Sequence, residues 1–320
     1  MDSYISRIEI TRPVPEILHE VIQTYKLGEL VRFNIFERGY EDFNVKLVTT
    51  SGTYIVKIFS KLRHPKFIKS YVEVLTLLSE KNLPTPKLFP INNSYLYTIH
   101  DGKKQSQLCV MNHFSDTSLL DQPPTKKDFL EIAEFLGKLH KITIPVYTGY
   151  DSWSVLNIPS EYTKNAPYIP ERDRPMADRA VELYSAIDLS GFRKSLVHGD
   201  IQREHVLKND KGTLCIIDWA CMSNNSCVVD LGIFYAQFGI DLSMDLLRSF
   251  ISDSLKIYTK KTPLSSKEIA SIPILMRAHH AAYLMKTSYL IYGKHDTSQQ
   301  TQDWFNFSSQ GLRQLEHFSL

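Results

Sequence analysis

Apolar and polar positions alternate along the first third of the chain and recur at helical spacing along the rest. The alternation over residues 30–59, broken at Gly39 and again at 50–52, predicts three antiparallel strands. Two further strands are expected at about 95–100 and 107–114, with a tight turn between them. After residue 64, apolar residues three or four positions apart predict one amphipathic helix, and these are Phe67, Tyr71, Leu75 and Leu78.

The pattern changes at residues 115–124, where serine, aspartate and a Pro-Pro pair separate the strand-rich part from a mostly helical remainder. We therefore expect two lobes, one formed by residues 1–114 and the other by residues 115–320.

Several helices are predicted in the second lobe. Capping boxes at Thr125 and Ser265 mark two helix starts, and Pro273 is expected to interrupt the helix that follows Ser265. A further helix is expected over residues 241–258. Residues 147–175 have weak periodicity, several prolines and the aromatics Trp153, Tyr162 and Tyr168, which is typical of a long loop. Such a loop either carries function or is a surface insertion.

Composition narrows the class of protein. A chain of 320 residues, 43% apolar, can bury one large core or two smaller ones. The net charge is +2, with lysine and arginine scattered among acidic residues, which argues against a nucleic-acid partner. The four cysteines lack metal-ligand spacing and predict reduced thiols in the cytosol. We found no signal sequence or membrane-length apolar run, so a cytoplasmic protein without membrane contact is expected.

Candidate chemistry begins with two aspartates at the ends of apolar runs. Asp200 belongs to a His-Gly-Asp loop, and Asp218 follows a later apolar run. A loop aspartate can take a proton from an attacking hydroxyl, and a second aspartate can hold magnesium against nucleotide phosphates. Taken singly, each is better explained as a turn residue. The order of buried strand, loop, strand, turn, strand and aspartate favours a phosphoryl-transfer site.

Two charged residues in the first lobe are open to two interpretations. Lys57 interrupts an apolar strand, which is costly unless the ammonium meets an anion, although an alternating strand could also turn it to solvent. Glu73 lies inside the predicted helix, where a glutamate is ordinarily solvated.

This order of elements resembles the protein-kinase-like fold, and within it the aminoglycoside phosphotransferase and choline kinase family. The catalytic loop has glycine between His198 and Asp200, where protein kinases have arginine. The loop at 37–44 has one glycine, and Trp219 follows Asp218 where protein kinases have phenylalanine. The resemblance implies a bilobal α+β fold, with a nucleotide-binding lobe at 1–114 and a catalytic, acceptor-binding lobe at 115–320.

The resemblance also implies roles for individual residues. Asp200 matches the catalytic base and Asp218 the magnesium ligand, with ATP or GTP as co-substrate. Lys57 matches the lysine that contacts the nucleotide phosphates, and Glu73 the glutamate that orients it. The linker should contact the adenine through backbone groups, around Met111 and His113. Residues expected only to support the loop are His198 and Asp230.

His205 departs from the common family pattern, which has a metal-binding asparagine there. Imidazole is a poorer ligand than an oxygen donor for a hard cation, so His205 either binds Mg²⁺ or packs to brace the loop. Aminoglycoside 2″-phosphotransferases and macrolide phosphotransferases resemble this chain in having histidine here. The substitution therefore indicates a subgroup.

The predicted function is ATP- or GTP-dependent phosphorylation of a hydroxyl on a small molecule. The alternative is a kinase-like scaffold that binds nucleotide without chemistry. The acceptor is left open between an aminoglycoside, a macrolide and an amino alcohol or homoserine-like metabolite. A macrolide would use the aromatics of 147–168. An aminoglycoside would need a cleft lined with carboxylates, and the candidates are Glu171, Asp173, Asp178 and Glu182. The alternative interpretation is that these four residues form only a solvated helix face.

Overall fold

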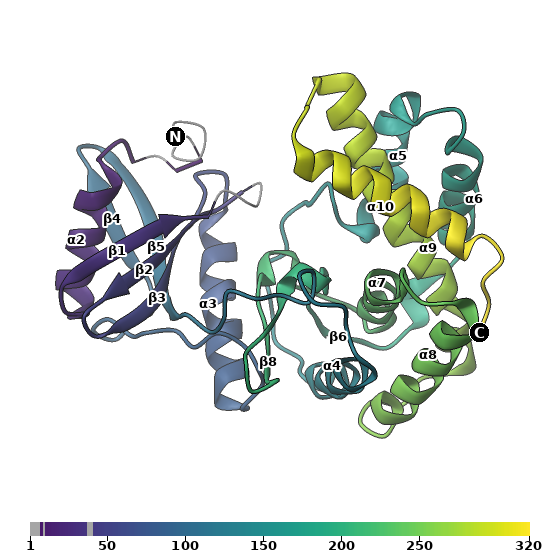
Figure 1. Ribbon diagram of the computed structural model, residues 1–320, viewed down its shortest axis with the longest axis horizontal. Helices are drawn as coiled ribbons and strands as arrows, with labels where there is room; N and C mark the ends of the chain where they lie inside the picture. The colour runs from purple at the N-terminus through teal and green to yellow at the C-terminus, as the bar shows by residue number, and fades with distance from the viewer. Residues whose placement is uncertain (1–6, 9, 37–40) are drawn as a thin grey trace. The chain divides into compact units, whose positions relative to one another are not determined.

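The computed structural model describes residues 7–8, 10–36 and 41–320. The turn expected at Gly39 and the first half of the loop at 37–44 therefore lie outside the described residues. The chain divides into two compact units, which are drawn in Figure 1. One comprises residues 1–117 and 207–217, and the other comprises residues 118–206 and 218–320.

Within the described residues, the first unit contains a five-stranded antiparallel sheet with strand order β1-β2-β3-β5-β4. The predicted meander and the later hairpin are both confirmed. The expected tight turn is present, since Asp101 pairs with Lys104 and Gly102 adopts a positive φ of 60°. The strands are β1 (Leu30–Ile35), β2 (Phe43–Thr49), β3 (Gly52–Ile58), β4 (Tyr97–Asp101) and β5 (Lys104–Asn112).

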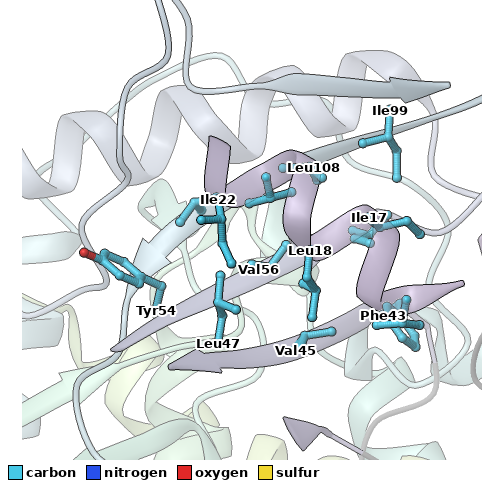
Figure 2. Packing of buried hydrophobic residues seen from close by; sticks show 14 of the residues in the cluster. Ile17, Leu18, Ile22, Phe43, Val45, Leu47, Tyr54, Val56, Ile99 and Leu108 are labelled. Atoms are coloured by element: carbon cyan, nitrogen blue, oxygen red, sulfur yellow. The ribbon is translucent and has the colours of Figure 1, made fainter. Parts of the chain in front are cut away.

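Helix α2 (Val14–Tyr25) covers one face of this sheet. Figure 2 shows Ile17, Leu18 and Ile22 of the helix packed with inward-facing strand residues such as Val45 and Val56. Successive side chains of a strand point to opposite faces. Since Val56 faces α2, its neighbour Lys57 must point to the other face of the sheet.

Helix α3 (Pro65–Glu80) is the amphipathic helix predicted after residue 64. His64 caps it by accepting the N–H of Lys66, and Pro65 occupies the first turn, where its missing N–H costs nothing. Its buried face includes Phe67 and Tyr71, as the spacing predicted.

The second unit is mostly helical. Both predicted capping boxes are present, at Thr125 with Asp128 and at Ser265 with Glu268. Among the described residues, no helix has the length and apolar character needed to cross a bilayer. The helices are α4 (Lys126–Leu139), α5 (Ile158–Asn165), α6 (Arg174–Ser185), α7 (Val228–Gly239), α8 (Met244–Thr259), α9 (Ser266–Ser288) and α10 (Gln299–Leu315).

Short strands frame the candidate catalytic loops. β6 (Lys194–Val197) pairs antiparallel with β9 (Ser223–Ser226). β7 (Val206–Lys208) pairs with β8 (Leu214–Ile216). The loop that contains Asp200 leaves the end of β6, and the loop that contains Asp218 follows β8.

Two predictions for this unit were wrong. Helix α9 continues through Pro273, because its packing against α7 and α10 holds the chain helical across the missing backbone donor. The long loop expected at 147–175 contains α5 and the start of α6. Helix α5 is two turns long with a proline in its first turn, too short to produce a clear apolar period.

Candidate active site

The His-Gly-Asp loop is held in place by Asp230 of α7. This carboxylate is fully buried and accepts the N–H groups of His198 at 2.7 Å and Gly199 at 2.8 Å. It also lies 3.0 Å from Nε2 of His140 on α4. Burial alone would raise the pKa of Asp230, but the hydrogen bond and charge of His140 outweigh it and lower the pKa. Asp230 thus fixes the loop backbone as a carboxylate anion.

Gly199 is the position of this loop that requires glycine. Its φ is +81°, and a Cβ there would lie 2.3 Å from the carbonyl oxygen of Cys221. His198 braces Asp200, because its Nδ1 accepts the N–H of Asp200 at 3.2 Å. These contacts set the direction in which the Asp200 side chain leaves the loop.

The carboxylate of Asp200 is largely buried, with 17% of its side chain exposed. Oδ1 accepts hydrogen bonds from Nε2 of Gln202 and from the hydroxyl of Tyr283, the latter at 3.2 Å. Burial raises the pKa of Asp200 to about 7, and the charges of Asp218 and Asp151 contribute to the rise, whereas His205 opposes it. A carboxylate with a pKa near neutrality suits proton transfer at physiological pH.

Asp218 lies beside the same loop. It adopts a left-handed conformation, with φ of 58°, and its Oδ1 accepts the N–H of Ala220 at 3.3 Å. Nε2 of His205 is 3.6 Å from Oδ2 of Asp218 and 3.6 Å from Oε1 of Glu204. The structure therefore brings Asp200, His205 and Asp218 together, and their roles stay predictions.

His205 is engaged on both sides of its ring. Nδ1 donates to the main-chain carbonyl of Asp200 at 2.8 Å, which is the bracing contact considered as the alternative to metal binding. Burial would lower the pKa of His205, but the charges of Asp200, Asp218 and Glu204 outweigh it and raise the pKa to about 9. A protonated ring offers no lone pair to a cation and would have to lose its proton before it bound one. Metal binding by His205 stays a prediction.

A magnesium ion would therefore depend on Asp218. In the described part of the chain, no group of three or more His, Cys, Asp or Glu side chains could hold a metal ion. Mg²⁺ in kinases commonly takes one or two carboxylates and completes its shell with phosphate oxygens and water. The carboxylate of Asp218 fits that pattern.

In the first unit, Lys57 is buried against a carboxylate. Its Nζ lies 2.8 Å from Oδ2 of Asp42, and both side chains are almost fully buried. Arg63 approaches the other oxygen of Asp42 at 3.4 Å, and the N–H of Ser60 donates to it at 3.0 Å. Burial alone would raise the pKa of Asp42, but the charges of Lys57 and Arg63 outweigh it and lower the pKa. The solvent-facing alternative for Lys57 was wrong.

Glu73, expected to orient Lys57, occupies a different place. Its carboxylate lies 3.7 Å from Lys69 on the outer side of α3, with 48% of the side chain exposed. The helix instead presents Tyr71, whose ring centre is 5.5 Å from Nζ of Lys57. Position 73 is two residues beyond 71, which turns it about 200° around the helix and away from the sheet. Asp42 takes the place expected for Glu73.

Strand register offers a signal that could have identified Asp42. Asn44 of β2 is directly opposite Lys57 of β3. Asp42 precedes Asn44 by two residues, so it shares a face with Asn44 and is a diagonal neighbour of Lys57. Counting back from the turn at Gly52 would have found it.

The linker residues expected near the adenine lie at the end of β5. Met111 is buried and pairs with Ile55 of β3. The N–H of His113 donates to the carbonyl of Thr53 at 3.2 Å, and its Nε2 is 2.8 Å from Asp116. Because that N–H is already used, adenine contacts in this segment would fall to other backbone groups, and they stay a prediction.

Two of the acidic residues proposed for a cationic acceptor are already paired with arginines. Asp173 is buried and bound by Arg313 at 2.6 Å and by Ser309 at 2.7 Å. Glu182 pairs on the surface with Arg179.

Sequence reasoning missed residues that do lie near Asp200, because nothing in their local spacing marks them: Asp151, Gln202, Glu204 and Tyr283.

Comparison with known proteins gives consistent results. Residues 32–263 match the model of a family described as the phosphotransferase enzyme family. The homoserine kinase of Methylobacillus flagellatus is 21% identical over 272 residues, which are 82% of this chain and 81% of that protein. Another homoserine kinase, from Methylobacillus glycogenes, is 22% identical over 273 residues, again 82% of this chain and 81% of that protein.

Solved structures resemble the chain along most of its length. A microcompartment-associated aminopropanol kinase aligns with a TM-score of 0.71 and 14% identity, covering 93% of this chain and 96% of that one. The choline kinase of Streptococcus pneumoniae aligns with a TM-score of 0.61 and 19% identity, covering 93% and 98%. The α+β protein-kinase-like fold expected from the sequence is thereby confirmed.

Proposed function

Because this chain belongs to the phosphotransferase enzyme family and is a small-molecule kinase, we propose that it transfers the terminal phosphoryl group of ATP to the hydroxyl of a small acceptor that also carries a charged nitrogen. The substrates named for the similar homoserine, aminopropanol and choline kinases share these two groups. We place this acceptor class before macrolides, and before aminoglycosides because two of the four carboxylates proposed to bind them are already paired, Asp173 with Arg313 and Glu182 with Arg179.

The proposal assigns a role to each charged residue. Asp200 orients the acceptor hydroxyl and takes its proton as the oxygen attacks the phosphorus. Lys57 contacts the nucleotide phosphates, and Asp42 holds its ammonium in place. When bound, Mg²⁺ on Asp218 supplies positive charge that stabilises the transferring phosphoryl group. Asp230 and His198 keep the loop in the conformation that these roles require.

The observation that carries the proposal is the state of Asp200. It is a mostly buried carboxylate, fixed by two donors on one oxygen, whose pKa of about 7 is matched to proton transfer at neutral pH. A loop aspartate that only terminated a strand would be solvated and would keep its ordinary pKa.

The experiment measures ATP consumption with homoserine, aminopropanol, choline, an aminoglycoside and a macrolide. We expect one of the small nitrogen-bearing alcohols to stimulate turnover. Asp200→Asn should lower that turnover by about 10² to 10⁴-fold while nucleotide binding, followed by calorimetry, is retained. Asp245→Asn is the matched control, since the Asp245 side chain is fully exposed. Full turnover in Asp200→Asn would remove Asp200 from the mechanism, and no response to any acceptor would favour the nucleotide-binding scaffold.

A further inference from the structure

Lys286 of α9 is a half-buried ammonium with neutral neighbours. Its Nζ is 2.7 Å from the hydroxyl of Ser152, 5.7 Å from the ring centre of Trp153 and 6.0 Å from that of Tyr289. Over the residues that the structure describes, no carboxylate lies within ion-pair distance of it. A partly desolvated cation held by a hydroxyl and two ring faces remains able to bind an anion.

The position of Lys286 connects it to the catalytic base. Tyr283 precedes it by three residues, so both side chains lie on the same face of α9, about one helical turn apart. The Tyr283 hydroxyl donates to Oδ1 of Asp200 at 3.2 Å, and its ring centre is 5.2 Å from that of Trp153. The ammonium therefore lies a short distance along the helix from the group that touches Asp200.

Asp151 supplies the opposite charge in the same region. Its Oδ2 accepts a hydrogen bond from the thiol of Cys221 at 2.9 Å, and its Oδ1 accepts one from the N–H of Trp153 at 2.9 Å. Both partners are neutral, because burial raises the pKa of the Cys221 thiol well above its usual value. The carbonyl of Cys221 faces Gly199, which places Asp151 beside the catalytic loop. Its negative charge also contributes to the raised pKa of Asp200.

We infer that Asp151 and Lys286 anchor the two charges of a zwitterionic acceptor, so that the substrate is a small hydroxy amino acid. The acceptor ammonium would bind Asp151 and its carboxylate Lys286, while its hydroxyl points to Asp200. The inference rests on the proposed function of the same site. In the transfer, the hydroxyl oxygen forms a bond to the γ-phosphorus, the bond from that phosphorus to ADP breaks, and the hydroxyl proton passes to Asp200.

The inference separates amino acids from amino alcohols. An amino alcohol could bind Asp151 through its ammonium but would offer no anion to Lys286. The ammonium of Lys286 would then lie near the ammonium of the acceptor. L-Homoserine and 3-amino-1-propanol form a matched pair, because they differ only in the carboxylate. The wild-type enzyme should prefer homoserine by about 10- to 100-fold in kcat/KM, the effect of one charge-assisted contact.

The test compares both acceptors in Lys286→Gln, with Lys256→Gln as the control because Lys256 is an exposed lysine of α8. Lys286→Gln should lower kcat/KM for homoserine by about 10- to 100-fold, mainly through KM, without lowering kcat/KM for 3-amino-1-propanol or changing the KM for ATP. Asp151→Asn should weaken both acceptors. These results would support the two anchors.

Three results would overturn the inference. An equal loss for both acceptors in Lys286→Gln would make the lysine a structural residue. A wild-type preference for 3-amino-1-propanol would contradict a carboxylate anchor. Turnover with a different acceptor class, but with no hydroxy amino acid, would reject the inference and leave the kinase assignment standing. The proposed function itself would fail only if no acceptor stimulated ATP consumption.

Discussion

The cluster around Lys57 and the cluster around Asp200 contain similar residues but differ in how their charges are balanced. In the first, Asp42 lies between the cations of Lys57 and Arg63, and its pKa is lowered. In the second, the carboxylates of Asp200, Glu204 and Asp218 face His205, and the pKa of Asp200 is raised. Because Glu41 also pairs with Arg63, the first cluster is neutralised from within, and the second carries excess negative charge.

This difference separates residues that hold a shape from residues kept available for chemistry. A buried ion pair that is fully compensated fixes its members, and removing one partner exposes the other to the cost of an unpaired buried charge. A carboxylate surrounded by like charges is unstable as an anion and gains by accepting a proton or a cation. The same chemical change, aspartate to asparagine, should therefore have opposite effects on stability in the two clusters.

The largest effect is expected for Asp42→Asn. The substitution leaves Lys57 buried without its carboxylate, so the free energy of unfolding should fall by about 3 to 5 kcal/mol. Denaturant unfolding at neutral pH, followed by far-ultraviolet circular dichroism, measures it. A loss below about 1 kcal/mol would show that Lys57 does not depend on this pair.

A gain of stability is expected for Asp200→Asn at pH 8 without nucleotide or magnesium. The folded-state pKa of about 7 exceeds the ordinary value of 3.8, so the folded protein binds the additional proton between these values. Wild-type stability should thus decline, relative to the variant, as pH rises from about 4 to 7. We expect the variant to gain roughly 1 to 3 kcal/mol between pH 5 and pH 8. A difference that is constant over this range would contradict the raised pKa.

The smallest effect is expected for Glu73→Gln. The pair with Lys69 is exposed, so the free energy of unfolding should change by less than about 0.5 kcal/mol. Turnover should also be unchanged, whereas Lys57→Gln should lose most of it. Equal loss of turnover in the two variants would restore Glu73 as the partner of Lys57.

The fold could be predicted where one face of an element is buried and the other is not. β2 alternates between buried and half-buried residues along its length, and α3 buries one stripe, so both left a clear period in the sequence. Helix α7 left none, because every residue from Val228 to Gly239 is buried. A helix surrounded by protein has no polar face to mark its period.

The candidate residues of the site were predicted from closeness in sequence or from the family resemblance. Asp200 and His205 share one loop, and the resemblance to a known family assigned Asp218. Asp151, Tyr283 and Lys286 come from segments more distant along the chain, and the contacts of Tyr283 with Trp153 and of Lys286 with Ser152 follow from packing that spacing does not encode. Glu73 was chosen by its position after Lys57, while the partner in the structure follows from strand register.

Residues 207–217 belong to the first unit although residues 118–206 of the second unit precede them, and this order affects folding during synthesis. Ile216 donates its N–H to Pro84, Lys208 donates its N–H to Thr117, and Ser115 donates its hydroxyl to Lys208. These partners leave the ribosome about 90 or more residues apart. The first unit therefore cannot be completed when its own sheet has been synthesised, and must wait until the segment preceding Asp218 has emerged.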